Sequence, residues 1–183
     1  MESHEMVTNI VLVKTHKTAS TTMASILFRF GASHNLQFYL TRNWHYIYPF
    51  AEYPELPQVN ITLYHHRSQQ MSTRDYARWY LKVVPRNHMI TILREPFSRA
   101  LSDYHFFIQP DHPDNTLESF LRNQTHPLSK HIHLMSNDLG VRNDYHMNMF
   151  LSHWHSFFSM FLITEQFDEV RCLIHIHTHI LTW

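Results

Sequence analysis

The feature that most constrains the fold is a short apolar run, followed by a polar loop and then by apolar residues at helical spacing. Residues 9–13 (NIVLV) are mostly β-branched and apolar, which is typical of a strand buried on both faces. The polar residues 14–22 follow. Met23, Ile26, Leu27 and Phe30 then recur as one face of a helix. A strand, a loop and a helix in this order open a βαβ unit, so the sequence predicts an α/β domain.

The same alternation continues along the chain. Further strands are predicted at residues 37–40, 60–64, 89–93 and 161–164, and helices at 72–80, 97–107, 116–122 and 143–158. Strands that alternate with helices favour a mostly parallel central sheet covered on both faces, which is a P-loop-like three-layer α/β sandwich. A length of 183 residues suits one such domain.

The overall charge excludes one large class of function. Lys plus Arg and Asp plus Glu number 15 each, so the formal net charge is zero with histidine neutral. A nucleic-acid-binding domain usually carries a strong positive field, which this balance does not supply. Any anion site must therefore come from local geometry, and no nucleic-acid partner is expected.

The loop after the first predicted strand is suited to a phosphate group. The start of a helix offers backbone N–H groups and the positive end of its dipole, to which this loop adds lysine and hydroxyl side chains. An ATPase P-loop needs G-x-x-x-x-G-K-[ST], and residues 14–22 contain no glycine, which argues against a P-loop kinase. The alternative is a hydroxyl-rich helix cap with two incidental lysines.

About 28 residues, NIVLVKTHKTASTTMASILFRFGASHNL, resemble the opening of the galactose-3-O-sulfotransferase (cerebroside sulfotransferase) family, far beyond a short motif. That family has a K-T-H-K-T-A-S-S-T loop, and this chain departs from it at Thr21, where a hydroxyl is retained. The resemblance implies the sulfotransferase fold and a loop that binds the 5′-phosphosulfate of the donor PAPS (3′-phosphoadenylyl sulfate). The donor-binding residues so implied are Lys14, Thr15, Lys17, Thr18, Ala19, Ser20, Thr21 and Thr22.

A second anion site is predicted where the strand at residues 89–93 ends. Arg94 follows that strand, where ligands bind in open α/β sheets, and its planar guanidinium can hold a phosphate through two hydrogen bonds. Ser102 lies two helical turns further on. From the residues alone, Arg94 can equally pair with Glu95 or Asp103. R-[DEN]-P followed by a serine at this spacing also resembles the 3′-phosphate segment of sulfotransferases.

The resemblance also implies catalytic roles. His16 corresponds to the histidine thought to remove the acceptor hydroxyl proton, and Lys17 to the lysine that stabilises the leaving oxygen. The segment Tyr64-His65-His66-Arg67 resembles a family H-x-R stretch near the acceptor. His65 and His66 are therefore candidate catalytic residues, with the choice between them open, and Arg67 is a candidate substrate residue.

Eighteen histidines invite a metal-site hypothesis, and three groups of them alternate along the chain. On a strand, alternation would place each group on one face. Zinc requires three or four converging ligands, and neither a cysteine pair nor an H-E-x-x-H motif accompanies these residues, so no metal is expected. The groups are His131 and His133; His153 and His155; and His175, His177 and His179.

The family-like region extends from residue 9 to residue 169, where FLITEQFDE resembles an I-T-E-x-F-D-E stretch of the family. Residues 170–183 are then interpreted as an atypical or truncated tail of one sulfotransferase-like domain. The resemblance implies transfer of a sulfuryl group from PAPS to a galactose hydroxyl, expected to be the 3-OH, of a glycolipid or glycan. It also implies the lumenal side of the Golgi membrane, with an anchor absent from this sequence. The alternative is a truncated, inactive relative that binds a nucleotide or a partner.

Overall fold

The computed structural model describes residues 6–39, 59–65, 84–122, 134–141 and 143–168. Within these ranges five strands form one sheet in the order β2-β3-β1-β4-β5, and every neighbouring pair is parallel. The α/β fold with a parallel central sheet is thus confirmed. The strands are β1 (Ile10–Lys14), β2 (Phe38–Tyr39), β3 (Ile61–His65), β4 (His88–Leu93) and β5 (Met160–Ile163).

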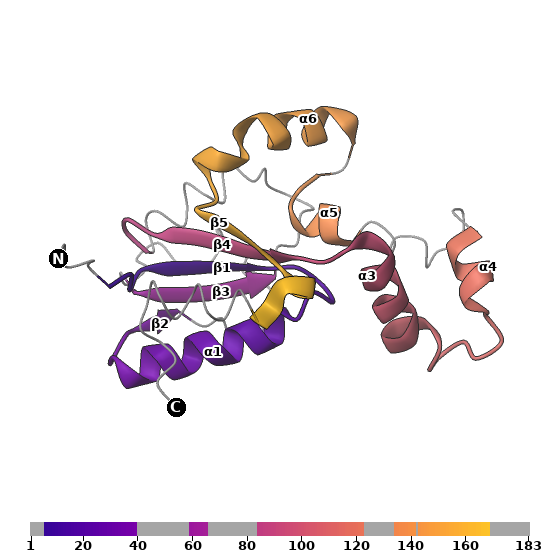
Figure 1. Ribbon diagram of the computed structural model, residues 1–183, viewed down its shortest axis with the longest axis horizontal. Coiled ribbons are helices and arrows are strands. Elements are labelled where there is room, and N and C mark those ends of the chain that lie inside the picture. The colour runs from indigo at the N-terminus through magenta and orange to yellow at the C-terminus, as the bar shows by residue number, and fades with distance from the viewer. Residues whose placement is uncertain (1–5, 40–58, 66–83, 123–133, 142, 169–183) are drawn as a thin grey trace, which may run out of the picture.

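Helices lie on both faces of the sheet and beyond its carboxyl edge. Figure 1 shows α1 along one face and α6 on the other, with α3 and α4 beyond the end of β4. A π-helical turn, Tyr104–Ile108, continues α3 without a break. The helices are α1 (Ser20–Ser33), α3 (Pro96–Asp103), α4 (Leu117–Arg122), α5 (Leu134–Asp138) and α6 (Asp144–His153), with 3₁₀ turns at Trp154–Ser156 and Thr164–Gln166.

Alternate residues of β1 face two separate apolar clusters. Ile10 and Leu12 point to the α1 side, where they pack with Met23, Leu27 and Phe30. The spacing of these three α1 residues is the helical pattern read from the sequence. All five side chains are at most 4% exposed, and full burial of each such side chain stabilises the fold by about 1.5–3 kcal/mol.

Val11 and Val13 face the opposite cluster. There they meet Leu139 and Val141, which follow α5, and Phe158, which follows α6. Because both faces of β1 are covered, the strand reads as a continuous apolar run rather than as an alternating one. The second cluster also holds the end of α5 against the sheet, because Leu139 and Val141 directly follow that helix.

The strand order places a topological switch point beside β1. The chain proceeds from β1 to β2 and β3 on one side and then returns to the other side as β4. Loops that leave two adjacent strands in opposite directions create a crevice at the carboxyl edge, and ligands of open α/β sheets bind there. Lys14 ends β1 and Arg94 follows β4, so both predicted anion segments start at this crevice.

Several sequence-based expectations need adjustment. The expected helix at residues 72–80 lies outside the described residues, and α5 was not predicted. His153 and His155 are not on a strand: His153 ends α6 and His155 lies in the 3₁₀ turn that follows. The other alternating histidines lie outside the described residues. No helix in the described ranges combines the length and apolar character needed to cross a bilayer.

Candidate functional site

The loop between β1 and α1 has an unusual backbone. Lys17 and Ala19 adopt φ values of 61° and 58°, the left-handed region that L-residues enter at a cost of about 1–2 kcal/mol each. Successive residues of opposite hand turn backbone N–H groups toward one point and form anion-binding concavities. Strain of this kind is concentrated at functional sites. The loop contains no glycine, but it adopts a conformation that usually requires glycine.

Hydroxyl groups inside the loop hold this shape. Thr15 Oγ1 donates to the Ile92 carbonyl at 2.5 Å, which ties the loop to β4. Thr18 Oγ1 and Ser20 Oγ each lie 3.0 Å from the Thr15 carbonyl oxygen and donate to it. All three hydroxyl-bearing residues are buried. Their side chains therefore support the loop from within, whereas Thr21 and Thr22 are exposed in the first turn of α1.

Arg94 joins the two predicted anion segments. Its Nη1 donates to the Lys17 carbonyl oxygen at 3.2 Å, so the guanidinium lies against the β1–α1 loop. The Arg94 Nε is 3.8 Å from Glu165 Oε1, too far for a hydrogen bond, and it has no hydrogen-bond partner within the described part of the chain. Thr164 Oγ1 lies 3.0 Å from the carbonyl oxygens of both Thr18 and Leu93. It therefore links the end of β5 to the β1–α1 loop and to the end of β4.

The start of α3 is fixed by a helix cap, and this bears on the alternative partners of Arg94. The Glu95 carboxylate accepts hydrogen bonds from the backbone N–H groups of Phe97 at 2.8 Å and Ser98 at 2.6 Å, and Pro96 occupies the first helical position. These hydrogen bonds lower the pKa of Glu95. The main role of Glu95 is thus to cap α3 immediately after Arg94.

Asp103, the other alternative partner, pairs with a different arginine. Arg99 Nη1 donates to Asp103 Oδ2 one helical turn away, and both side chains are almost fully buried. Burial raises the pKa of Asp103 to about 6, against the attraction of Arg99. One face of α3 is thus anchored in the interior by an ion pair, which directs the opposite face of the helix toward the crevice.

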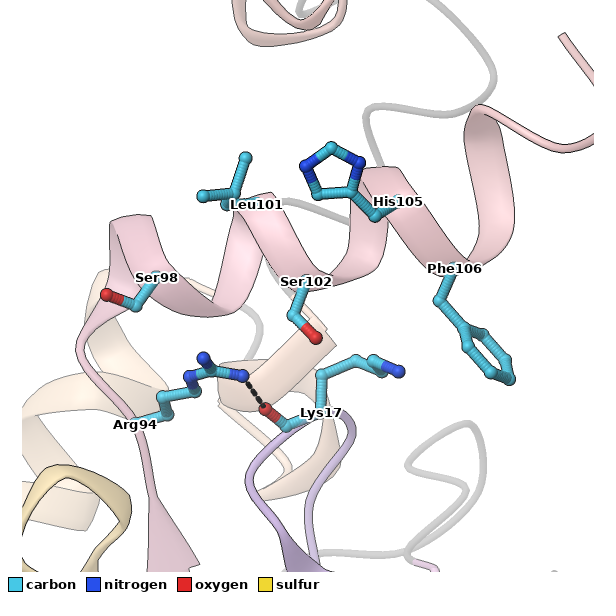
Figure 2. Close-up of a pocket in the computed structure, with 7 residues that line it drawn as sticks. All are labelled: Lys17, Arg94, Ser98, Leu101, Ser102, His105 and Phe106. Carbon is cyan, nitrogen blue, oxygen red and sulfur yellow. Dashed lines mark hydrogen bonds between the residues drawn. The ribbon is translucent and has the colours of Figure 1, made fainter. Parts of the chain in front are cut away.

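Seven residues from the loop, the end of β4, α3 and the π-helical turn that continues α3 line a pocket of about 380 Å³: Lys17, Arg94, Ser98, Leu101, Ser102, His105 and Phe106. Figure 2 shows the Ser102 hydroxyl pointing toward the space between Arg94 and Lys17. Ser98, Ser102 and His105 recur at helical spacing and so share one side of α3 and the π-helical turn that continues it. The predicted anion residues Lys17, Arg94 and Ser102 therefore meet in one pocket.

The ammonium group of Lys17 rests on an aromatic ring in this pocket. Lys17 Nζ is 3.7 Å from the centroid of the Phe106 ring, and Phe106 is 62% exposed. Burial, with the nearby charge of Arg94, lowers the pKa of Lys17 despite the opposing effect of Asp103. In Figure 2 the Lys17 side chain runs past Ser102 toward Phe106, away from the Arg94 guanidinium.

His16 is held by a residue that sequence analysis did not identify. Its Nδ1 is 2.8 Å from both carboxylate oxygens of Asp138, and its backbone N–H donates to Asp138 Oδ2 at 2.6 Å. Asp138 is the last residue of α5 and is buried. The two residues are 122 positions apart, and no local pattern connects them.

The remaining predicted site residues lie at the same edge or outside the described ranges. Lys14 ends β1 half-buried, and burial lowers its pKa. The parallel register pairs Lys14 with His65, so the end of β3 adjoins the loop. His66 and Arg67 lie outside the described residues. Among the residues that were described, no group of three or more His, Cys, Asp or Glu side chains is arranged to hold a metal ion.

The parallel sheet and the cationic pocket at its carboxyl edge define a P-loop-like α/β protein. Comparison with known proteins narrows this class. The sequence model of the galactose-3-O-sulfotransferase family matches residues 2–183. The chain therefore belongs to the galactose-3-O-sulfotransferase family.

Individual relatives agree with this assignment. The galactosylceramide sulfotransferase of Mus musculus is 36% identical over 107 residues, which cover 54% of this chain and 24% of the relative. Galactose-3-O-sulfotransferase 3 of Bos taurus is 28% identical over an alignment covering 95% of this chain and 45% of the relative. Galactose-3-O-sulfotransferase 2 of Sus scrofa is 31% identical over an alignment that covers 97% of this chain and 49% of the relative. The chain thus spans between a quarter and half the length of the curated relatives it matches.

Proposed function

We propose that this chain binds the sulfate donor PAPS and transfers its sulfuryl group to a galactose hydroxyl, the 3-OH, of a glycolipid or glycan. Its relatives are named as sulfotransferases of galactose and galactosylceramide. The observation that carries the proposal is the hydrogen bond from Arg94 to the Lys17 carbonyl, which brings two cationic segments to one pocket. A ligand with two phosphate-containing groups on one ribose matches two adjacent anion sites.

In the proposed arrangement the β1–α1 loop binds the 5′-phosphosulfate, and Arg94 with Ser102 binds the 3′-phosphate. The loop contributes backbone N–H groups shaped by the left-handed residues Lys17 and Ala19. Arg94 contributes guanidinium N–H groups, including that of Nε, as charge-assisted donors to phosphate oxygens. Ser102 contributes its hydroxyl as a neutral donor. Lys14 adjoins the loop as a further cation, and no metal is assigned.

The reaction itself requires alignment, charge stabilisation and removal of one proton. His16 is the proposed base that accepts the proton of the sugar hydroxyl. Lys17 is the proposed stabiliser of the bridging oxygen, where negative charge develops as the sulfuryl group leaves. His65, His66 and Arg67 are the proposed acceptor-side residues, because β3 ends beside β1. The site of action proposed from the family is the lumenal side of the Golgi membrane.

The test is transfer of radiolabelled sulfate from PAPS to a panel of galactosides by the purified chain. We expect transfer to galactose-terminated acceptors, and loss of it in Lys17→Ala, Arg94→Ala and His16→Ala. Arg122→Ala is the matched control, since Arg122 lies on α4 with its side chain 79% exposed. Nucleotide binding without transfer would instead make the chain a nucleotide-binding relative. Equal transfer by Arg94→Ala and Arg122→Ala would reject the donor site.

A further inference from the structure

The contact between His16 and Asp138 has a feature that loop stability alone does not require. One buried carboxylate, 3% exposed, holds both the main chain and the imidazole ring of His16. A hydrogen bond to the backbone N–H would suffice to fix the loop. The additional 2.8 Å contacts with Nδ1 fix the ring itself.

The contact also determines which ring nitrogen can act as a base. An ionised carboxylate only accepts hydrogen bonds, so an ionised Asp138 places the proton of the neutral His16 ring on Nδ1. The lone pair then lies on Nε2, at the opposite side of the ring. The His16 side chain is 23% exposed, so part of the ring reaches solvent, whereas the Asp138 side chain, 4% exposed, is buried. An anchored ring with a defined tautomer is what a positioned general base needs.

Within the described part of the chain, the charged groups that act on His16 include Asp138 from α5, and Asp103 and Arg99 from α3. Burial and the charge of Arg99 lower the pKa of His16, whereas the hydrogen bond and charge of Asp138 and the charge of Asp103 raise it. The effects that raise it are larger in total, so the pKa of His16 is raised. Burial likewise raises the pKa of Asp138, against the hydrogen bonds and charge of His16. Asp138 supplies the largest of the contributions that raise the His16 pKa, so its loss should lower that pKa.

We propose that Asp138 is a positioning residue that orients the His16 imidazole and fixes its tautomer for general-base catalysis. This inference rests on the proposed function. In the step concerned, the sugar hydroxyl oxygen forms a bond to sulfur, and the bond from sulfur to the bridging phosphate oxygen breaks. Its electron pair stays on adenosine 3′,5′-bisphosphate, and the hydroxyl proton passes to His16 Nε2.

The kinetic test compares Asp138→Asn with the exposed control Asp111→Asn. Misplacement of a catalytic group by a remote change costs on the order of 10²-fold, so kcat of Asp138→Asn should fall by about that factor. Its affinity for adenosine 3′,5′-bisphosphate should stay within about threefold of that of the parent chain. Because His16 must be neutral to act, the rate rises with pH through its pKa. The acidic limb of the profile should therefore shift to lower pH in Asp138→Asn.

A double variant separates positioning from general loop support. If the two residues act as a unit, His16→Ala with Asp138→Asn should be no slower than His16→Ala alone. The proposal would be overturned if the losses of the two single variants add in the double variant. It would also be overturned if kcat of Asp138→Asn is unchanged, or falls with no shift of the acidic limb.

A spectroscopic readout separates this proposal from the proposed function. Nitrogen-15 NMR of histidine-labelled chain, with His16 assigned by comparison with His16→Gln, should show Nδ1 protonated in the neutral ring. The pKa of His16 should fall in Asp138→Asn. The same tautomer and pKa in both chains would overturn the positioning role, even if no sulfate is transferred. If the NMR experiment gives the expected tautomer and pKa change but the chain binds no nucleotide, only the donor function is rejected.

Discussion

Replacement of Phe106 by leucine should strengthen the binding of a simple anion in the pocket. The Lys17 ammonium lies 3.7 Å from the centre of the Phe106 ring and is directed away from Arg94 (Figure 2). To bind an anion held by the β1–α1 loop, the ammonium must leave that ring. The contact therefore competes with anion binding.

The magnitude follows from the exposure of the ring. Phe106 is 62% exposed, and a cation–π contact at such a site is worth about 0.5–1 kcal/mol. Removal of this competing contact should lower the dissociation constant by about two- to fivefold. Leucine keeps an apolar side chain on the π-helical turn but has no aromatic face.

The assay is isothermal titration calorimetry with inorganic pyrophosphate, which has no base that could stack on Phe106. Phe97→Leu is the matched control, because Phe97 is 55% exposed on α3 but does not line the pocket. The gain should disappear in a Lys17→Ala background, where no ammonium remains to be released. Unchanged or weaker pyrophosphate binding in Phe106→Leu would refute the reasoning, as would the same gain without Lys17.

Three further predictions concern stability and are tested by urea unfolding. Because the pKa of Asp103 is raised from 3.8 to about 6 on folding, its contribution to the free energy of unfolding should fall as pH rises from 3.8 through about 6. Asp103→Asn should lack this fall. Parallel pH profiles of stability for the parent chain and Asp103→Asn would contradict the prediction. Ala19→Gly should stabilise the chain by about 0.5–1 kcal/mol, since φ is 58°, and a loss would show that the residue is unstrained. Gly31→Ala should destabilise the chain, because the new Cβ would lie 2.1 Å from the Phe38 ring; a gain would show that the ring moves aside.

The parts of the fold that local sequence determines were predictable. The apolar run at residues 9–13 and the spacing of Met23, Leu27 and Phe30 identified β1 and α1, because burial on one or both faces leaves a periodic pattern. β1 begins at Ile10 and ends at Lys14, which continues the backbone ladder beside His65 although its side chain is polar. α5, with five residues, is too short for helical periodicity to identify.

That Lys17, Arg94 and Ser102 would come together was predictable, but the contacts inside the candidate site were not. Lys17, Arg94 and Ser102 follow strand ends, and parallel strands end at one edge of a sheet, so their convergence follows from the fold. Thr15 and Thr18 are predicted donor-binding residues, and the structure adds that their hydroxyls are buried in contacts that shape the loop. Without a glycine in the loop, no residue type indicated its left-handed backbone. The pairing of His16 with a residue 122 positions away depends on tertiary packing alone.

Calorimetric binding of adenosine 3′,5′-bisphosphate, compared with adenosine 5′-phosphate and adenosine 3′-phosphate, tests most directly whether two cationic segments hold one nucleotide. Charge-assisted hydrogen bonds contribute about 1.5–3 kcal/mol, so the bisphosphate should bind at least about tenfold more tightly than either monophosphate. Arg94→Ala should abolish its advantage over the 5′-phosphate, and Lys17→Ala should abolish its advantage over the 3′-phosphate. Equal affinities for all three nucleotides, or an advantage that survives both substitutions, would contradict the account.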